Sequence, residues 1–329
     1  MMRRQLPEPR LVPKESRHDT RSNAQARVKG GRMETSVLDV SPDHLETILA
    51  DGEFVLYRSR DPIDRTSPRS ALVVMPRSEY PRPHATRMLE HEHSLRDELD
   101  PAWALRPLKL TTFEGRPALV LEDPGGELLL QRAGTPMDVA DVLRVGAGVA
   151  AALRQLHGHG LIHKDIKPSH VMVEWGTGQV WLWGFGLTSR LPRERRAPEP
   201  PEVIAGTLAY MAPEQTGWMN RSIDARSDLY ALGVVLYELS TGSLPFTASD
   251  AMGWVHGHIA QRPVPPAERR QGLPEVVSAI VMSCSPRPPR IATRRLSVSN
   301  ATSGAASRSG KPTVGSTHSR SPNTTYLTG

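Results

Sequence analysis

Two side chains in HKDIKPSH (163–170), Asp165 and Lys167, have the types and spacing for acid–base chemistry on a phosphorylated compound. A carboxylate within hydrogen-bond reach can accept the proton of a hydroxyl group, and a nearby ammonium can screen the charge of a phosphate in transfer. A pair of this kind is compatible with proton transfer from a hydroxyl group that attacks a phosphate. The alternative is that Asp165 is a buried loop carboxylate that only accepts hydrogen bonds from the backbone.

Three further patterns follow this stretch in a fixed order. They are WGFG (183–186), GTLAYMAPEQ (206–215) and DLYALG (228–233). Together the four patterns resemble the catalytic loop, the metal loop, the end of the activation segment and the anchor of the larger lobe in protein kinases. Chance would rarely produce all four in this order, so we expect a protein-kinase-like fold.

The resemblance implies an α+β fold of two lobes, a small β-rich N-lobe and a helical C-lobe. We expect the kinase-like domain to span residues 37–282, with the N-lobe at 37–122 and the C-lobe at 127–282. Residues 1–36 are rich in Arg, Pro, Ser and Gly without a period, which predicts a disordered basic arm. Residues 283–329 have a similar composition, which predicts a disordered tail.

Three positions that bind ATP and metal in this family hold other residue types here. His170 stands where the resemblance places a metal-binding asparagine, and Gly184 stands where it places the aspartate of D-F-G. Met75 is assigned to the position of the phosphate-binding lysine, in SALVVMP (70–76). Mg²⁺ prefers hard oxygen ligands. We therefore expect ATP binding to be weak or lost, Mg²⁺ binding to be doubtful, and phosphoryl transfer to be very slow or absent.

An alternative is an active enzyme that recruits metal through other carboxylates, such as Glu122, Asp123 or Glu174. The first two lie in LEDPGG (121–126), which resembles the hinge between the lobes. Backbone groups of a hinge pair with adenine and need no particular side chain, so we assign Glu122 and Asp123 to a remaining nucleotide site. A small-molecule phosphotransferase fits less well, because it shares neither the MAPE pattern nor DLYALG.

Hydrophobic periodicity indicates the elements that position these residues. Residues 42–60 are expected to form a short helix and then a strand, with Gly52 in a degenerate glycine-rich turn or an ordinary edge hairpin. A strand at 70–76 follows, and then a helix at 84–100. Glu92 on that helix matches the glutamate that pairs with the family's lysine. With no lysine present, we expect Glu92 to be a solvated charge.

Two strands are expected around 108–112 and 118–122, followed by a long amphipathic helix at 137–160. The apolar residues of that helix, which recur at helical spacing, are Val142, Val145, Val149, Leu153 and Leu156. The helix is expected to pack beneath the catalytic loop.

The net charge of the chain, +6, comes from its ends. Residues 1–33 have a net charge of +6 and residues 283–329 of +7, which leaves −7 for residues 34–282. The ends have no aromatic interleaving and no groove-reading motif, so we expect no nucleic-acid partner. A single cysteine, Cys284, excludes an internal disulfide, and no apolar run approaches a membrane span. The expected location is the cytoplasm, without membrane attachment.

A closer resemblance is supported by the segment GTLAYMAPEQTGWMNRSIDARSDLYALGVVLYELSTGSLPF (206–246), which continues to WVHGHIAQRPVPP (254–266). With its MNRSID insertion it is similar to the N-terminal kinase-like region of bacterial multi-domain sensor histidine kinases, which continue into ATPase-like and GAF modules. The resemblance implies signalling with protein partners, namely the downstream modules of a longer sensor kinase.

The helical pattern of the C-lobe stops at Met282. One inserted base after its codon would permit a frame that continues the kinase pattern, including an arginine that the resemblance pairs with Glu214. We therefore expect residues 283–329 to be out of frame and the C-lobe to be truncated. A non-functional structural fragment of a larger sensor kinase is the corresponding alternative.

Overall fold

The computed structural model describes residues 42–60, 70–190, 208–219 and 221–284. The predicted arm at 1–36 and all of the predicted tail beyond Cys284 lie outside these residues. No helix in the described part of the chain is long and apolar enough to cross a membrane.

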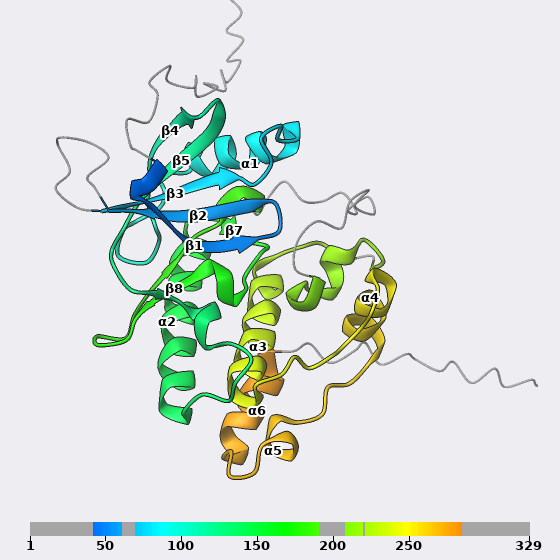
Figure 1. The fold of residues 1–329 in the computed structure, drawn as a ribbon. Helices are drawn as coiled ribbons and strands as arrows, with labels where there is room; N and C mark the ends of the chain where they lie inside the picture. Colours follow the sequence, from blue (N-terminus) through cyan, green and yellow to red (C-terminus); the bar gives the residue numbers. More distant parts are fainter. Residues whose placement is uncertain (1–41, 61–69, 191–207, 220, 285–329) are drawn as a thin grey trace, which may run out of the picture. The chain divides into compact units, whose positions relative to one another are not determined.

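An antiparallel sheet of five strands forms the first part of the domain, in the order β1-β2-β3-β5-β4 (Figure 1). Its strands are β1 (Leu45–Asp51), β2 (Phe54–Ser59), β3 (Ala71–Pro76), β4 (Pro107–Phe113) and β5 (Arg116–Glu122). Helix α1 (Pro83–Ser94) contacts β4 and β5 of this sheet. The central strand β3 is buried along its whole length.

The prediction for residues 42–60 was wrong in its first half. Only Pro42–His44 are helical, as a 3₁₀ turn, and Leu45–Asp51 form an edge strand. The strand forms because β2 supplies a hydrogen-bonding partner across a tight turn, in which Gly52 has a φ of +56°. Pairing between strands therefore overrides the weak helical pattern of this segment.

The second part of the domain is mainly helical. Its helices are α2 (Val139–Gly158), α3 (Ala225–Thr241), α4 (Ala251–Ala260), α5 (Pro266–Arg269) and α6 (Glu275–Cys284). Small sheets accompany them: β6 (Glu127–Leu128), β8 (Val171–Glu174) and β9 (Gln179–Leu182) form one, and β7 (Leu161–Ile162) pairs with β10 (Ser189–Arg190). Short 3₁₀ turns join these elements: η1 (Pro42–His44), η2 (Leu129–Arg132), η3 (Pro168–His170), η4 (Phe185–Leu187), η5 (Leu208–Tyr210) and η6 (Pro213–Thr216).

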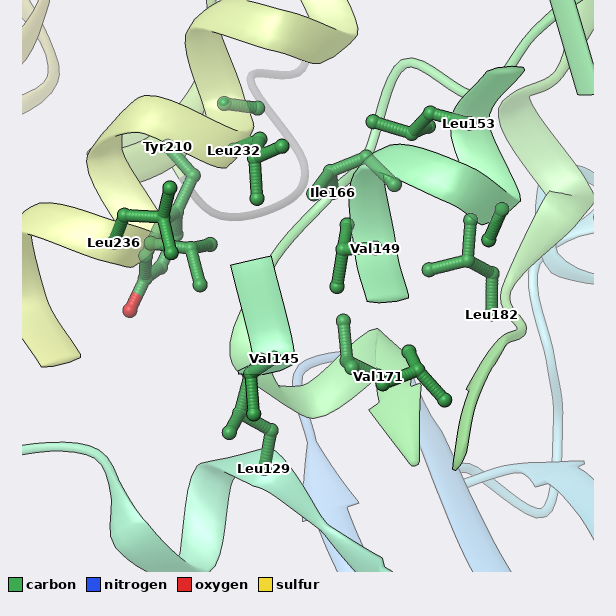
Figure 2. Close-up of a cluster of buried hydrophobic side chains, with 14 of the residues drawn as sticks. Leu129, Val145, Val149, Leu153, Ile166, Val171, Leu182, Tyr210, Leu232 and Leu236 are labelled. Carbon is green, nitrogen blue, oxygen red and sulfur yellow. The ribbon is translucent and has the colours of Figure 1, made fainter. Parts of the chain in front are cut away.

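Helix α2 begins at an N-cap, Asp138, whose carboxylate accepts a hydrogen bond from the N–H of Ala140. The five apolar residues predicted to line one face of α2 are all buried in one cluster. Figure 2 shows Val145, Val149 and Leu153 of this face beside Ile166 of the loop 163–170. The prediction that this helix packs beneath the loop is confirmed.

The ends of helices α1 and α6 differ from the predicted ends. Helix α1 ends at Ser94, and the predicted continuation to residue 100 is a series of turns. Leu95 and Leu99 are nevertheless buried in the cluster that also contains residues of α2 and α3. Their apolar spacing therefore reflects burial in this cluster and does not indicate that the helix continues. Helix α6 continues to Cys284, two residues past the predicted end of the domain.

Candidate functional site

A cavity of ≈ 460 Å³ lies between the β1–β2 hairpin, helix α1 and the loop 163–170. Apolar side chains form much of its wall, namely Leu49, Phe54, Leu56, Val74, Met88 and Leu89. The polar side chains that line it include Asp51, Glu92, Asp165, Lys167 and His170. The structure thus brings both predicted catalytic residues, Asp165 and Lys167, into one cavity, together with the substituted positions His170 and Gly184.

The buried carboxylate of Asp228, at the start of α3, accepts hydrogen bonds from the backbone of the loop 163–170. Its Oδ1 accepts a hydrogen bond from the N–H of Lys164 at 2.8 Å, and its Oδ2 accepts one from the N–H of His163 at 2.9 Å. The ring of His157 contacts the same oxygen at 2.8 Å. Lys164 has a φ of +71°, a conformation that costs free energy in a non-glycine residue. The carboxylate therefore stabilises a strained backbone that presents Asp165.

Asp165 and Lys167 lie close together, with 3.5 Å between Lys167 Nζ and Asp165 Oδ2. Lys167 Nζ is closer still, at 3.1 Å, to Oδ2 of Asp51 at the end of β1. Ser169 Oγ donates a hydrogen bond to the same oxygen of Asp51 at 3.0 Å. Asp51 was not predicted as a site residue, because no sequence motif marks it. Its effect is to give the lysine ammonium a second carboxylate partner from across the cavity.

The imidazole of His170 lies across the backbone of Gly184. Its Nδ1 donates to the carbonyl oxygen of Asp165 at 2.8 Å, which fixes this tautomer. Burial lowers the pKa of His170 well below its usual value, and Lys167 and His163 act in the same direction, so the ring is neutral. Gly184 has a φ of +81°, and a Cβ placed on it would lie 2.7–2.8 Å from three ring atoms of His170. A side chain at position 184 has no room while this ring is present.

Glu92 on α1 is 3% exposed, so the prediction of a solvated charge was wrong. The inward face of the helix carries it toward Gly184, whose N–H donates to Glu92 Oε1 at 3.1 Å. Burial raises the pKa of Glu92 to about 7, although hydrogen bonds from the backbone of Phe185 and Gly184 oppose the shift. Among the described residues, no Lys or Arg forms an ion pair with it.

Comparison with known proteins identifies the family. Residues 114–287, slightly more than half of the chain, match the family model described as protein kinase domain. The chain belongs to the protein kinase family. The loop 163–170 is therefore the kinase catalytic loop, and the sheet and the helical part are the two lobes of the predicted α+β kinase fold.

Bacterial serine/threonine-protein kinases are among its relatives. The chain is 33% identical to PknB of Mycobacterium tuberculosis over 175 residues, which cover 53% of this chain and 28% of PknB. It is 36% identical to PksC of Streptomyces coelicolor over 168 residues, 51% of this chain and 29% of PksC. It is 38% identical to pkn3 of Myxococcus xanthus over 140 residues, 41% of this chain and 25% of pkn3. The matched part therefore spans less than a third of each relative.

The assignment of Met75 to the kinase lysine position was off by one residue. Met75 is buried with Val73 on one face of the sheet, in a cluster apart from the cavity. Val74 points to the opposite face, where it packs with Leu89 of α1 and lines the cavity. Since strand side chains alternate in direction, a shift of one residue exchanges the two faces. The residue that faces the cavity beside Glu92 is thus valine, which carries no charge.

Magnesium-bound ATP, the group that the family implies, does not fit the residues of this cavity. The space that an aspartate at position 184 would occupy is filled by the His170 ring. Neutral imidazole is a poor replacement for an oxygen ligand of Mg²⁺. Within the described residues no three His, Cys, Asp or Glu side chains are grouped so that they could hold a metal ion.

The hinge was predicted to keep backbone groups that could pair with adenine. Its observed hydrogen bonds differ from that prediction. Pro124 has no N–H, the N–H of Glu122 donates to the carbonyl of Arg106, and the N–H of Gly125 donates to Asp123 Oδ1. Backbone donors at these three positions are therefore absent or engaged. Residues 122–126 do not line the cavity described above.

The carboxylates considered as replacement metal ligands lie elsewhere. Asp123 is buried and binds Arg58, with 2.8 Å between Oδ2 and Nε, and it also accepts a hydrogen bond from Ser70. Glu174 caps a turn by accepting hydrogen bonds from Gly176 and Thr177. The structure does not bring Glu122, Asp123 or Glu174 to the cavity that contains Asp165.

Proposed function

We propose that this chain is a signalling module of the serine/threonine kinase type in which phosphoryl transfer is lost or very slow. One observation carries the proposal: the His170 ring fills the space of the metal-binding side chain that Gly184 lacks. The cavity face of β3 also presents Val74 in place of a lysine. Removal of one preorganised charge contact in an enzyme commonly lowers the rate by ~10²–10³, and such losses do not simply add.

Binding of ATP is accordingly proposed to be weak or absent. Phosphate groups are bound by cations and by free backbone N–H groups. Lys167 is partnered by two carboxylates, and the backbone donors at Glu122, Pro124 and Gly125 of the hinge are absent or engaged. The domain would then act through its surface, by contacts with protein partners, and not through nucleic acid or a membrane.

The assay that tests this proposal uses the full chain with labelled ATP, Mg²⁺ or Mn²⁺, and a mixture of serine- and threonine-containing peptides. We expect no transfer above that of the Asp165→Asn variant. Transfer that Asp165→Asn abolishes would overturn the proposal and would establish the alternative of an active kinase with an atypical metal site. That alternative is favoured by one feature, the pairing of Asp165 with Lys167 in the cavity.

A cytoplasmic sensor kinase is the proposed context of the module. The support is the resemblance of residues 206–246 and 254–266, with the MNRSID insertion, to kinase-like regions of bacterial sensor histidine kinases. On this proposal, the partners are downstream modules of a longer protein, and residues beyond Met282 are read out of frame. The DNA around codon 282 provides the test, because the frame hypothesis requires a single-base change that opens a kinase-like continuation.

The buried Glu214 provides a second test of the same hypothesis. It is 7% exposed and accepts a hydrogen bond from Ser227 Oγ at 2.6 Å. No ion pair in the described part of the chain includes it. If the alternative frame supplies its arginine, the melting temperature of the corrected protein should rise. An unchanged melting temperature would leave the structural fragment as the better description of this chain.

A further inference from the structure

The charges that line the interlobe cavity are mainly negative. Among the described residues that line it are four carboxylates (Asp51, Glu53, Glu92 and Asp165) and one ammonium, that of Lys167. The His170 ring is neutral for the reasons given above. The histidine at the rim, His84, is exposed to solvent. An anionic ligand would therefore enter a region of like charge, whereas a cation would be attracted.

The one ammonium is already engaged. Lys167 Nζ lies 3.1 Å from Asp51 Oδ2 and 3.5 Å from Asp165 Oδ2, and its side chain is only 9% exposed. A ligand phosphate would have to replace these intramolecular partners. The polar wall of the cavity is therefore better suited to attract a positive group than a negative one.

Glu92 is the carboxylate for which a ligand cation would matter most. It is buried and lines the cavity, and it accepts hydrogen bonds from the backbone of Gly184 and Phe185, which do not neutralise its charge. The side chains beside it on β3 and α1 are apolar, namely Val74, Met88 and Leu89. A buried carboxylate without a cation is unfavourable, and a cation delivered by a ligand would relieve this cost.

We propose that this cavity binds an organic monocation, a protonated amine attached to an apolar body. The ammonium would lie at Glu92, and the body would pack against Val74, Leu89 and Phe54. A volume of ≈ 460 Å³ suits a small molecule of this kind. The inference deepens the proposed function, because it names the ligand class of a kinase cleft that has lost the features for nucleotide.

Three probes with the same apolar body separate charge from shape: 4-phenylbutylammonium, 4-phenylbutanol and 4-phenylbutyrate. Each is titrated into the full chain at about pH 8, where the amine is protonated and an acid with a pKa near 7 is mostly ionised. We expect the ammonium to bind roughly tenfold more tightly than the alcohol, and the carboxylate to bind most weakly. Equal affinity for ammonium and alcohol, tighter binding of the carboxylate, or no saturable binding of the ammonium would overturn the proposal.

Two variants locate the site. Glu92→Gln keeps the shape and the acceptor for Gly184 N–H, and it should lower the ammonium affinity about tenfold while leaving the alcohol unchanged. Glu90→Gln, at an exposed position of the same helix, is the matched control and should change neither. Val74→Lys places an ammonium of the protein in the cavity and should abolish binding of the probe. Ammonium binding that is unaffected by both cavity variants would contradict the proposed site.

The outcome is separable from that of the transfer assay. Detection of phosphoryl transfer would overturn the proposed loss of activity without deciding what the probes do. Failure of all probes in an inactive protein would overturn the ligand inference alone.

Discussion

At the scale of single residues, Glu92 keeps the glutamate of the family motif, although the lysine that would pair with it is absent. Its α1 neighbours Ala85 and Leu89 are buried, so the helix face that carries them also carries the carboxylate inward. The cavity face of β3 carries Val74, which has no charge that could pair with this carboxylate. Desolvation then disfavours the charged form, which is why the pKa of Glu92 is raised to about 7.

This shift predicts a pH-dependent gain in stability for Glu92→Gln. A carboxyl group whose pKa is raised from 4.5 to about 7 stabilises the fold below the lower value, and that contribution is lost as pH rises through 7. Glutamine does not titrate, so the variant should exceed the wild type by up to about 3 kcal/mol at pH 8 and by little near pH 4.5. Urea unfolding at both pH values measures the difference.

The control for this prediction is Glu90→Gln, which should change the free energy of unfolding by less than about 0.5 kcal/mol at either pH. The charged and titratable groups on the catalytic loop that share the cavity, Asp165, Lys167 and His170, are present in both variants. A stability difference between Glu92→Gln and wild type that does not grow with pH would contradict the assigned burial.

The overlap of His170 with a side chain at position 184 predicts coupling between two substitutions. Gly184→Asp adds a Cβ at 2.7–2.8 Å from the ring atoms and forces a non-glycine residue to a φ of +81°. We expect it to destabilise the fold by roughly 1–3 kcal/mol. His170→Asn removes the ring, so the double variant should recover about 1 kcal/mol or more beyond the sum of the single changes.

Thermal or urea unfolding of the four proteins in this cycle measures the coupling. His170→Asn alone serves as the control for the loss of the imidazole and of its hydrogen bond to Asp165. Strict additivity of the two changes would show that the two positions are not in contact. The cycle also indicates whether restoring a metal-binding residue requires both positions to change together.

At the scale of elements, the catalytic loop depends on the start of α3. The Asp228 carboxylate is 1% exposed and accepts hydrogen bonds from two backbone N–H groups of the loop. A loop of this shape cannot supply these partners itself, because Lys164 is in a left-handed conformation. Removal of the carboxylate leaves buried donors without acceptors.

We therefore expect Asp228→Ala to lower the free energy of unfolding by about 3–5 kcal/mol, in the range for loss of a buried charged hydrogen-bonding group. Asp224→Ala is the comparison at the same end of α3, because Asp224 accepts from Arg226 N–H as an N-cap. Loss of an N-cap costs about 1 kcal/mol. Equal effects of the two changes in urea unfolding would argue against a special role of Asp228 in bracing the loop.

At the scale of the whole described domain, one apolar cluster joins the two lobes. It contains Leu72 and Leu121 of the five-stranded sheet together with Met172 of β8 and Trp183. All four are nearly or fully buried. Because side chains from both lobes fill this space, we expect the lobes to unfold together.

Met172→Ala tests this expectation. Met172 has no exposed surface, so its truncation should cost about 2–5 kcal/mol. The protection of amides against hydrogen exchange should fall in both the sheet and α3. Met252→Ala, at a residue 53% exposed, should have little effect. Loss of protection confined to the sheet would show that the lobes unfold separately.

The sequence by itself determined the family fold and most of its elements. The period of the apolar residues in α2, the four ordered motifs and the apolar strand at 70–76 are local patterns, and local patterns are readable without coordinates. The substitutions at His170 and Gly184 were visible for the same reason. Asp165 and Lys167 were predicted as neighbours, and the structure places them 3.5 Å apart.

Only the tertiary structure decided which face each residue presents and what lies opposite. The assignment of Val74, and not Met75, to the cavity face depends on the register of strand β3. A shift of one residue exchanges the two faces of the strand, and the pairing of β3 with β2 and β5 fixes the register. The burial of Glu92, the contact of Asp51 with Lys167 and the filling of position 184 by a ring from position 170 are contacts between distant segments. Such contacts arise from packing in three dimensions, so no local pattern in the chain records them.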